Sequence, residues 1–95
     1  MSTSELIPIV ISSTQALFGT EENLVGEHDA LVWLEGKIAY MLNHDFNGLV
    51  NLLYRIDVYE SKAKTCFGKQ NEEIAKCLAG LIWERQLQKV ESRQK

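Results

Sequence analysis

Two histidine–aspartate pairs are the residues whose types could hold a metal ion or serve a phosphohydrolase: His28-Asp29 and His44-Asp45. Neighbouring residues of a helix point in different directions, and the pairs lack the further ligands that a metal site needs. Both pairs stand at the expected starts of helices, where an aspartate caps the first turn. We therefore predict no metal site and give both aspartates a structural role.

Other short motifs of catalysis or cofactor binding do not occur in this 95-residue chain. There is no GxGxxG, phosphate-binding loop, GxSxG or HExxH pattern. The carboxylate pairs Glu21-Glu22 and Glu72-Glu73 fall at expected helix starts, where negative charge suits the helix dipole. We predict no catalytic, cofactor-binding or metal-binding residue, and a protein that is not an enzyme.

The two cysteines, Cys66 and Cys77, form neither a CxxC motif nor a disulfide framework. We expect two small buried thiols in a reducing cytosol. The segment before LIPIVI lacks the positive charge of a signal peptide, and that apolar run is shorter than a membrane span. The prediction is a cytoplasmic protein without a membrane partner.

The C-terminal stretch LIWERQLQKVESRQK turns an apolar stripe into a basic one. In a helix over residues 71–93, the face of Leu78 and Ile82 continues through Arg85, Lys89 and Arg93, each four residues from the next. We call these three residues the basic face. It is expected to pair with acids of residues 1–50, or to meet an acidic partner protein. Nucleic acid is the alternative partner, disfavoured because the chain carries a net charge of −3.

Charge is divided unevenly along the chain. Residues 1–50 hold one base against seven acids, whereas residues 51–95 hold nine bases against six acids. Such a split predicts either that the halves pack on each other or that the basic half faces an acidic partner.

A second stripe lies nearly opposite the basic face: Gly80, Trp83, Leu87 and Val90. One interpretation sandwiches the helix between two layers of its own domain, and the other makes the stripe a homodimer interface anchored by Trp83. We favour the interface, because 95 residues offer little material for a second layer. Gly80 is expected to mark a tight helix contact.

Apolar spacing is helical nearly everywhere, and no segment alternates strictly. We expect one all-α domain over residues 1–95, a compact bundle of four to five helices with a long C-terminal helix. The expected helices cover residues 4–18, 29–43, 46–56, 57–67 and 71–93. A strand at 9–11 and a loose attachment of residues 1–20 stay open. The helix over 46–56 is apolar nearly all round, which predicts a central position. Asp57 and Glu60 form a capping signature for the next helix.

Two stretches, LLYRIDVYESK and IAKCLAGLIWERQLQKVESR, resemble a group of small uncharacterised bacterial proteins over about residues 38–93. The matching positions are Tyr54, Arg55, Ile56, Asp57, Glu84, Arg85, Gln86, Gln88, Lys89 and Arg93. The resemblance implies an all-helical cytoplasmic protein and no particular activity. We therefore expect a non-enzymatic protein–protein interaction module that forms a homodimer through its C-terminal helix, with a nucleic-acid-binding accessory protein as the alternative.

Overall fold

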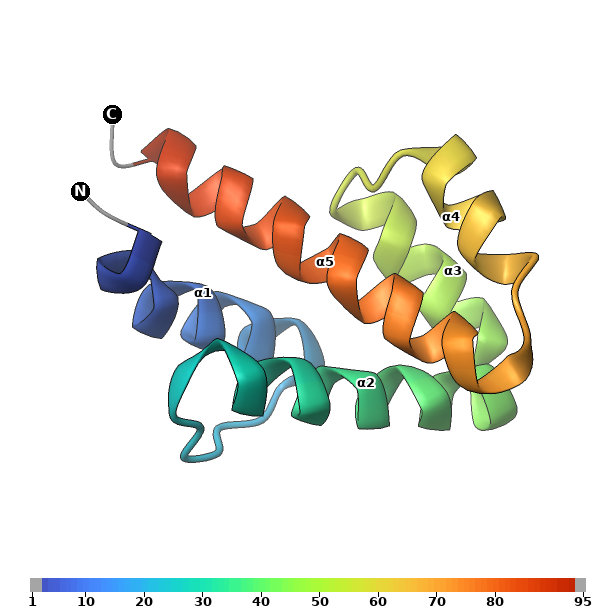
Figure 1. Cartoon of the computed structure of the whole chain (residues 1–95), viewed down its shortest axis with the longest axis horizontal. Helices are drawn as coiled ribbons and strands as arrows, with labels where there is room; N and C mark the ends of the chain where they lie inside the picture. The colour runs from blue at the N-terminus through green and yellow to red at the C-terminus, as the bar shows by residue number, and fades with distance from the viewer. Residues whose placement is uncertain (1–2, 94–95) are drawn as a thin grey trace.

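The computed structural model describes residues 3–93, which form five helices and no strand (Figure 1). The helices are α1 (Thr3–Phe18), α2 (Gly26–His44), α3 (Phe46–Arg55), α4 (Glu60–Phe67) and α5 (Asn71–Arg93). This confirms the predicted all-α bundle with a long C-terminal helix. The predicted helices begin and end within three residues of those observed.

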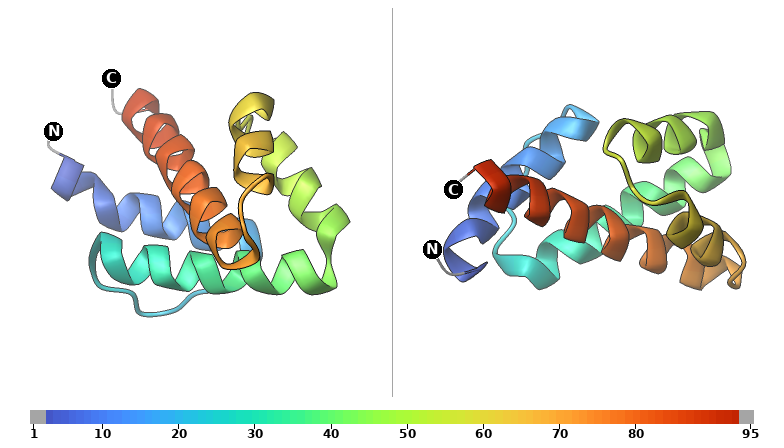
Figure 2. Two further views of the ribbon diagram at one scale, coloured as in Figure 1. Left: turned by 45° about the vertical axis from the view of Figure 1, so that its right-hand side comes forward. Right: turned by 90° about the horizontal axis from the view of Figure 1, so that it is seen from above.

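Helix α5 is the central element of the bundle, because it packs against α2, α1 and α4. Figures 1 and 2 show it running diagonally across α2, with α1 on one side and the α3–α4 pair on the other. The prediction of a central position for residues 46–56 is wrong. Helix α3 packs mainly on α2 and buries Leu49, Leu52 and Leu53, while its opposite side faces outward.

Helix α1 is docked on the body rather than loosely attached. Leu6, Val10 and Ile11 are buried against the core, and the alternative of a strand at 9–11 is wrong. Gly19 ends the helix with a φ of +69°, a left-handed conformation that favours glycine. The core that these helices share includes fully buried side chains from α1, α2, α3 and α5: Val10, Leu34, Ile38, Leu49, Leu78, Ile82 and Val90.

The two ends of α3 are held by aspartates in different roles. Asp45 caps its start as predicted, because the Gly48 amide donates to Asp45 Oδ1 at 3.0 Å. Asp57 was predicted to cap the next helix, and this is wrong: it closes α3 instead. Its φ is +60°, and the amides of Asp57 and Val58 donate to the carbonyls of Tyr54 and Leu53. This is a Schellman ending with aspartate in the place of the usual glycine.

Cys66 and Cys77 are joined by a disulfide, so the expectation of two free thiols is wrong. The turn between α4 and α5 folds the two helices against each other and brings the two Cα atoms to 5.5 Å. The bond ties α4, a helix of eight residues, to the central helix of the bundle.

Two glycines inside helices, Gly36 and Gly48, differ in the space around them. Gly36 has open space where a Cβ would lie, so Gly36→Ala should raise the free energy of unfolding by about 0.5–1 kcal/mol through helix propensity. Gly48→Ala is the matched variant: its Cβ would overlap the Asp45 carboxylate and displace a cap worth about 1 kcal/mol, which cancels the gain. Urea unfolding followed by circular dichroism measures both. Equal stabilisation by the two substitutions would contradict the role of Asp45.

Candidate functional site

The Gly80–Val90 stripe lies inside the chain's own bundle. Trp83 is 4% exposed and Val90 1%, while Gly80 and Leu87 are half-buried. The predicted interface is therefore wrong for Trp83 and Val90, because helices of the same chain already cover them. Gly80 marks no tight contact either, since a Cβ at this position would meet nothing within 4 Å. The other interpretation, a helix sandwiched between two layers, describes α5 correctly.

The basic face does not present three free cations. Arg85 is engaged by its own chain: its Nε donates to the Ile56 carbonyl at 2.9 Å, and its Nη2 lies 3.9 Å from Asp57 Oδ2. Lys89 is half-buried, and exposed Arg93 donates from Nε to the Lys89 carbonyl at 3.3 Å. Arg85 thus holds the end of α3 against α5, which removes the first cation from any phosphate-binding row.

The acidic and basic halves are not joined by ion pairs within residues 3–93. Arg85 pairs with Asp57 and Lys64 pairs with Glu60, so both partners of each pair come from the second half of the chain. The explanation that residues 1–50 neutralise the basic face is therefore wrong for Arg85.

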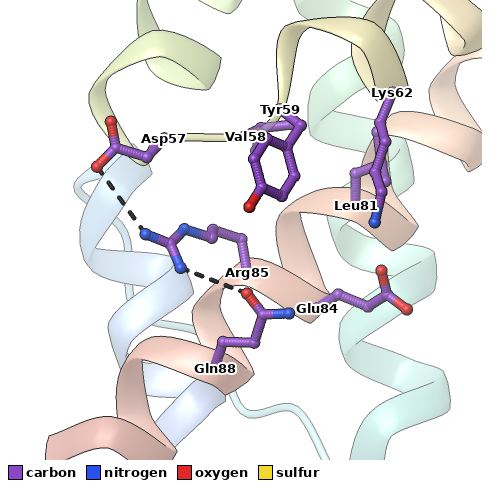
Figure 3. Close-up of a pocket in the computed structure, with 8 residues that line it drawn as sticks. All are labelled: Asp57, Val58, Tyr59, Lys62, Leu81, Glu84, Arg85 and Gln88. Atoms are coloured by element: carbon purple, nitrogen blue, oxygen red, sulfur yellow. Dashed lines mark hydrogen bonds and ion pairs between the residues drawn. The ribbon is translucent and has the colours of Figure 1, made fainter.

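A polar cleft of about 340 Å³ lies between α5 and the segment that links α3 to α4 (Figure 3). Lys62 and Tyr59 line one wall, with the ammonium 5.7 Å from the centre of the Tyr59 ring. Arg85 and Gln88 line the other wall and bond to each other at 3.3 Å. The lining contains no histidine, cysteine, serine or threonine, so it offers no pairing of a nucleophile with a histidine base.

A larger hollow of about 600 Å³ adjoins this cleft, on the other side of the linking segment. We call it the α3–α4 groove. Its lining residues come from both helices and the link between them: Val50, Leu53, Tyr54, Asp57, Val58, Tyr59, Glu60, Ala63, Lys64 and Phe67. The rings of Phe46 and Phe67 meet edge to face, 5.6 Å between centres, and bring the start of α3 to the end of α4.

Exposed apolar and aromatic side chains gather at the groove. Of its lining residues, Tyr54 is 84% exposed, Tyr59 73% and Val50 43%, and Phe46 beside it is 50% exposed. Phe46, Val50 and Tyr54 follow one another at intervals of four residues and form a stripe along α3. Clustered exposed apolar side chains rimmed by polar groups are typical of binding surfaces.

Charges in the groove are balanced by neighbours. The Asp57 carboxylate faces Arg85, and Lys64 Nζ lies 3.3 Å from Glu60 Oε1, one helical turn away. The Glu60 and Lys64 side chains are 84% and 75% exposed. The groove is thus a neutral apolar surface with one acid and one base side by side on α4.

The groove was missed in the sequence because α3 is apolar on two sides. One side, with Leu49, Leu52 and Leu53, is the core side, and the stripe of Phe46, Val50 and Tyr54 is the outer one. The available signal was that one short helix carries two apolar faces, of which a small domain can cover only one.

No group of three or more histidine, cysteine, aspartate or glutamate side chains in the described chain could hold a metal ion. None of its described helices combines the length and the apolar character needed to cross a membrane. Comparison with protein-family models, curated proteins and solved structures finds no match to this chain.

Proposed function

We propose that this chain is a non-enzymatic interaction module that binds a protein segment in the α3–α4 groove. The observation that carries the proposal is the stripe of Phe46, Val50 and Tyr54, exposed beside a hollow of about 600 Å³. When a partner covers apolar and aromatic side chains that are exposed to water, the free energy of the system falls.

Tyrosine supports this assignment. Tyr54 and Tyr59 stand at the rim of the groove, mostly exposed, and each can bury a ring while its hydroxyl stays hydrated. Aromatic residues of this kind are enriched in protein interfaces and supply much of their binding energy. The proposal thus keeps the predicted interaction module and moves its surface from Trp83 on α5 to the groove.

The other predicted roles find less support. A nucleic-acid-binding face would need Arg85 free, but Arg85 is engaged with Ile56 and Asp57. The likeness to small bacterial proteins and the cytoplasmic location remain predictions. The cysteines do not support a cytoplasmic location, because they form a disulfide and disulfides persist chiefly in oxidising compartments.

The test is selection of peptides from a random helical peptide library on protein immobilised at low density. Selected peptides should bind the wild type and lose about ten-fold or more in affinity for a Val50→Asp, Tyr54→Asp variant, because a carboxylate buried in an apolar groove is poorly solvated. Fluorescence anisotropy of the labelled peptides measures both affinities.

The control is Val32→Asp, Tyr40→Asp on α2, where the same two residue types are also exposed and lie about two helical turns apart. This variant should bind the selected peptides as tightly as the wild type. Peptides that bind equally to the groove variant, or a selection that enriches no peptide, would reject the groove as a docking surface.

A further inference from the structure

We propose that the occupant of the α3–α4 groove is a second copy of this chain, related by a two-fold axis that sets α4 antiparallel to α4 of the partner. This inference rests on the proposed function and names its partner. Three observations lead to it: the two helices that frame the groove, the charges on α4, and the size of the domain.

Helices α3 and α4 frame the groove between them. Both helices pack on the body, through Leu49 and Leu52 of α3 and through Cys66 of α4, while the groove between them stays open. The two helices diverge after their link, as Figure 2 shows, and the rings of Phe46 and Phe67 bridge the start of α3 and the end of α4. Two copies packed with their grooves together cover both stripes of Phe46, Val50 and Tyr54.

The groove side of α4 carries one acid and one base, so two copies of this surface can be complementary in charge. Glu60 and Lys64 lie one turn apart on the same face of the helix and are both exposed. In an antiparallel pair of α4 helices, Glu60 of each copy lies opposite Lys64 of the other, so the ion pair within each helix is extended by two reciprocal ion pairs between the copies. A two-fold contact needs this property, because each side of it is the same surface.

A partner of strong charge fits the groove less well than a second copy. The Asp57 carboxylate is matched by Arg85, and Glu60 pairs with Lys64 of the same helix, so the occupant meets one acid and one base side by side. A strongly acidic or basic segment would meet a like charge at Glu60 or Lys64. The second copy offers one of each, together with the same apolar and tyrosine side chains.

Dimerisation also suits the size of the chain. A domain of 95 residues buries only roughly two-thirds of its unfolded surface, so covering further apolar area adds to its stability. Two-fold dimers are the commonest closed assemblies of such chains, and they leave no open end.

The experiment uses Glu60→Lys and Lys64→Glu, studied separately and mixed. Each single variant places like charges opposite each other in its own homodimer, which should weaken dimerisation about ten-fold or more over two sites. In the equimolar mixture, lysines of one variant face glutamates of the other, so a heterodimer should form at wild-type concentrations. Sedimentation velocity of one fluorescently labelled variant with the unlabelled other measures this directly.

Both positions are solvent-exposed, so each variant should fold, and far-UV circular dichroism with thermal unfolding checks that it does. Val50→Asp should abolish the dimer without touching either charge, and Val32→Asp should leave it unchanged. The double exchange Glu60→Lys, Lys64→Glu restores opposite charges and should dimerise again.

Two kinds of result would overturn the inference. A wild type that stays monomeric up to about 1 mM, or single variants that dimerise like the wild type, would exclude the second copy as occupant. If selected peptides still bind the groove in that case, the proposed function stands with a different partner. A wild-type dimer that survives Val50→Asp would place self-association elsewhere and leave the groove to the peptide test.

Discussion

Loss of the Cys66–Cys77 bond should lower the free energy of unfolding by about 3 kcal/mol. The two cysteines are 11 residues apart, and a cross-link closing a loop of this length removes that much chain entropy from the unfolded state. Urea unfolding of the oxidised protein, of the protein held in dithiothreitol, and of Cys66→Ala, Cys77→Ala measures the effect. Alanine is chosen because both positions are partly or fully buried and a hydroxyl there would need a partner.

The chemistry of reduction provides the control. Dithiothreitol gives two electrons and two protons to the bond, leaving two thiols and becoming a cyclic disulfide itself. The double alanine variant has no bond to reduce, so its urea midpoint should be the same with and without dithiothreitol. Equal midpoints for the oxidised and reduced wild type would show that the bond does not contribute to stability.

The stability lost on reduction of the Cys66–Cys77 bond should be lost mainly in α4 and in the groove that α4 helps to form. This helix has eight residues, too few to be stable in water without tertiary support, and it packs mainly on α5. Amide hydrogen exchange should therefore rise first in residues 60–67 upon reduction. The groove would lose the wall that carries Glu60, Lys64 and Phe67, so dimerisation and peptide binding should weaken together.

Helix positions could be predicted from the sequence because each rests on local signals. Asp45 and Gly19 mark two helix ends correctly, and the spacing of apolar residues identifies the helices between them. Asp57 was misassigned because its left-handed conformation is seldom adopted by residues other than glycine, and the pattern with Glu60 fits a helix start equally well.

The candidate site could not be predicted, because periodicity identifies apolar faces without showing what covers them. Trp83 on α5 and Val50 on α3 both belong to a second apolar face of a helix. The tertiary arrangement buries the first beneath its own chain and leaves the second 43% exposed. The disulfide could not be predicted for the same reason, because the 5.5 Å between the two Cα atoms depends on how the turn after α4 folds back.

Trp83→Ala tests this distinction and should have the largest effect on stability. Trp83 is 4% exposed, and removing a buried indole loses its burial and leaves a cavity, which costs about 3–5 kcal/mol. Unfolding in urea is followed by far-UV circular dichroism and by the fluorescence of Trp33, the remaining tryptophan. Tyr54→Ala, at an 84% exposed position, should change the stability of the monomer by only about 0.5 kcal/mol or less.

The same two variants separate folding from association. If Trp83 belongs to the core, the folded Trp83→Ala protein keeps the wild-type mass in light scattering at concentrations where it is still native. Tyr54→Ala should do the reverse, weakening the dimer while leaving the monomer stable, because its ring lies at the rim of the groove. A Trp83→Ala protein that is stable but monomeric would return the interface to α5. Trp83→Leu serves where Trp83→Ala is too unstable to study, because leucine fills part of the cavity. It should lose less stability than Trp83→Ala and still keep the wild-type mass.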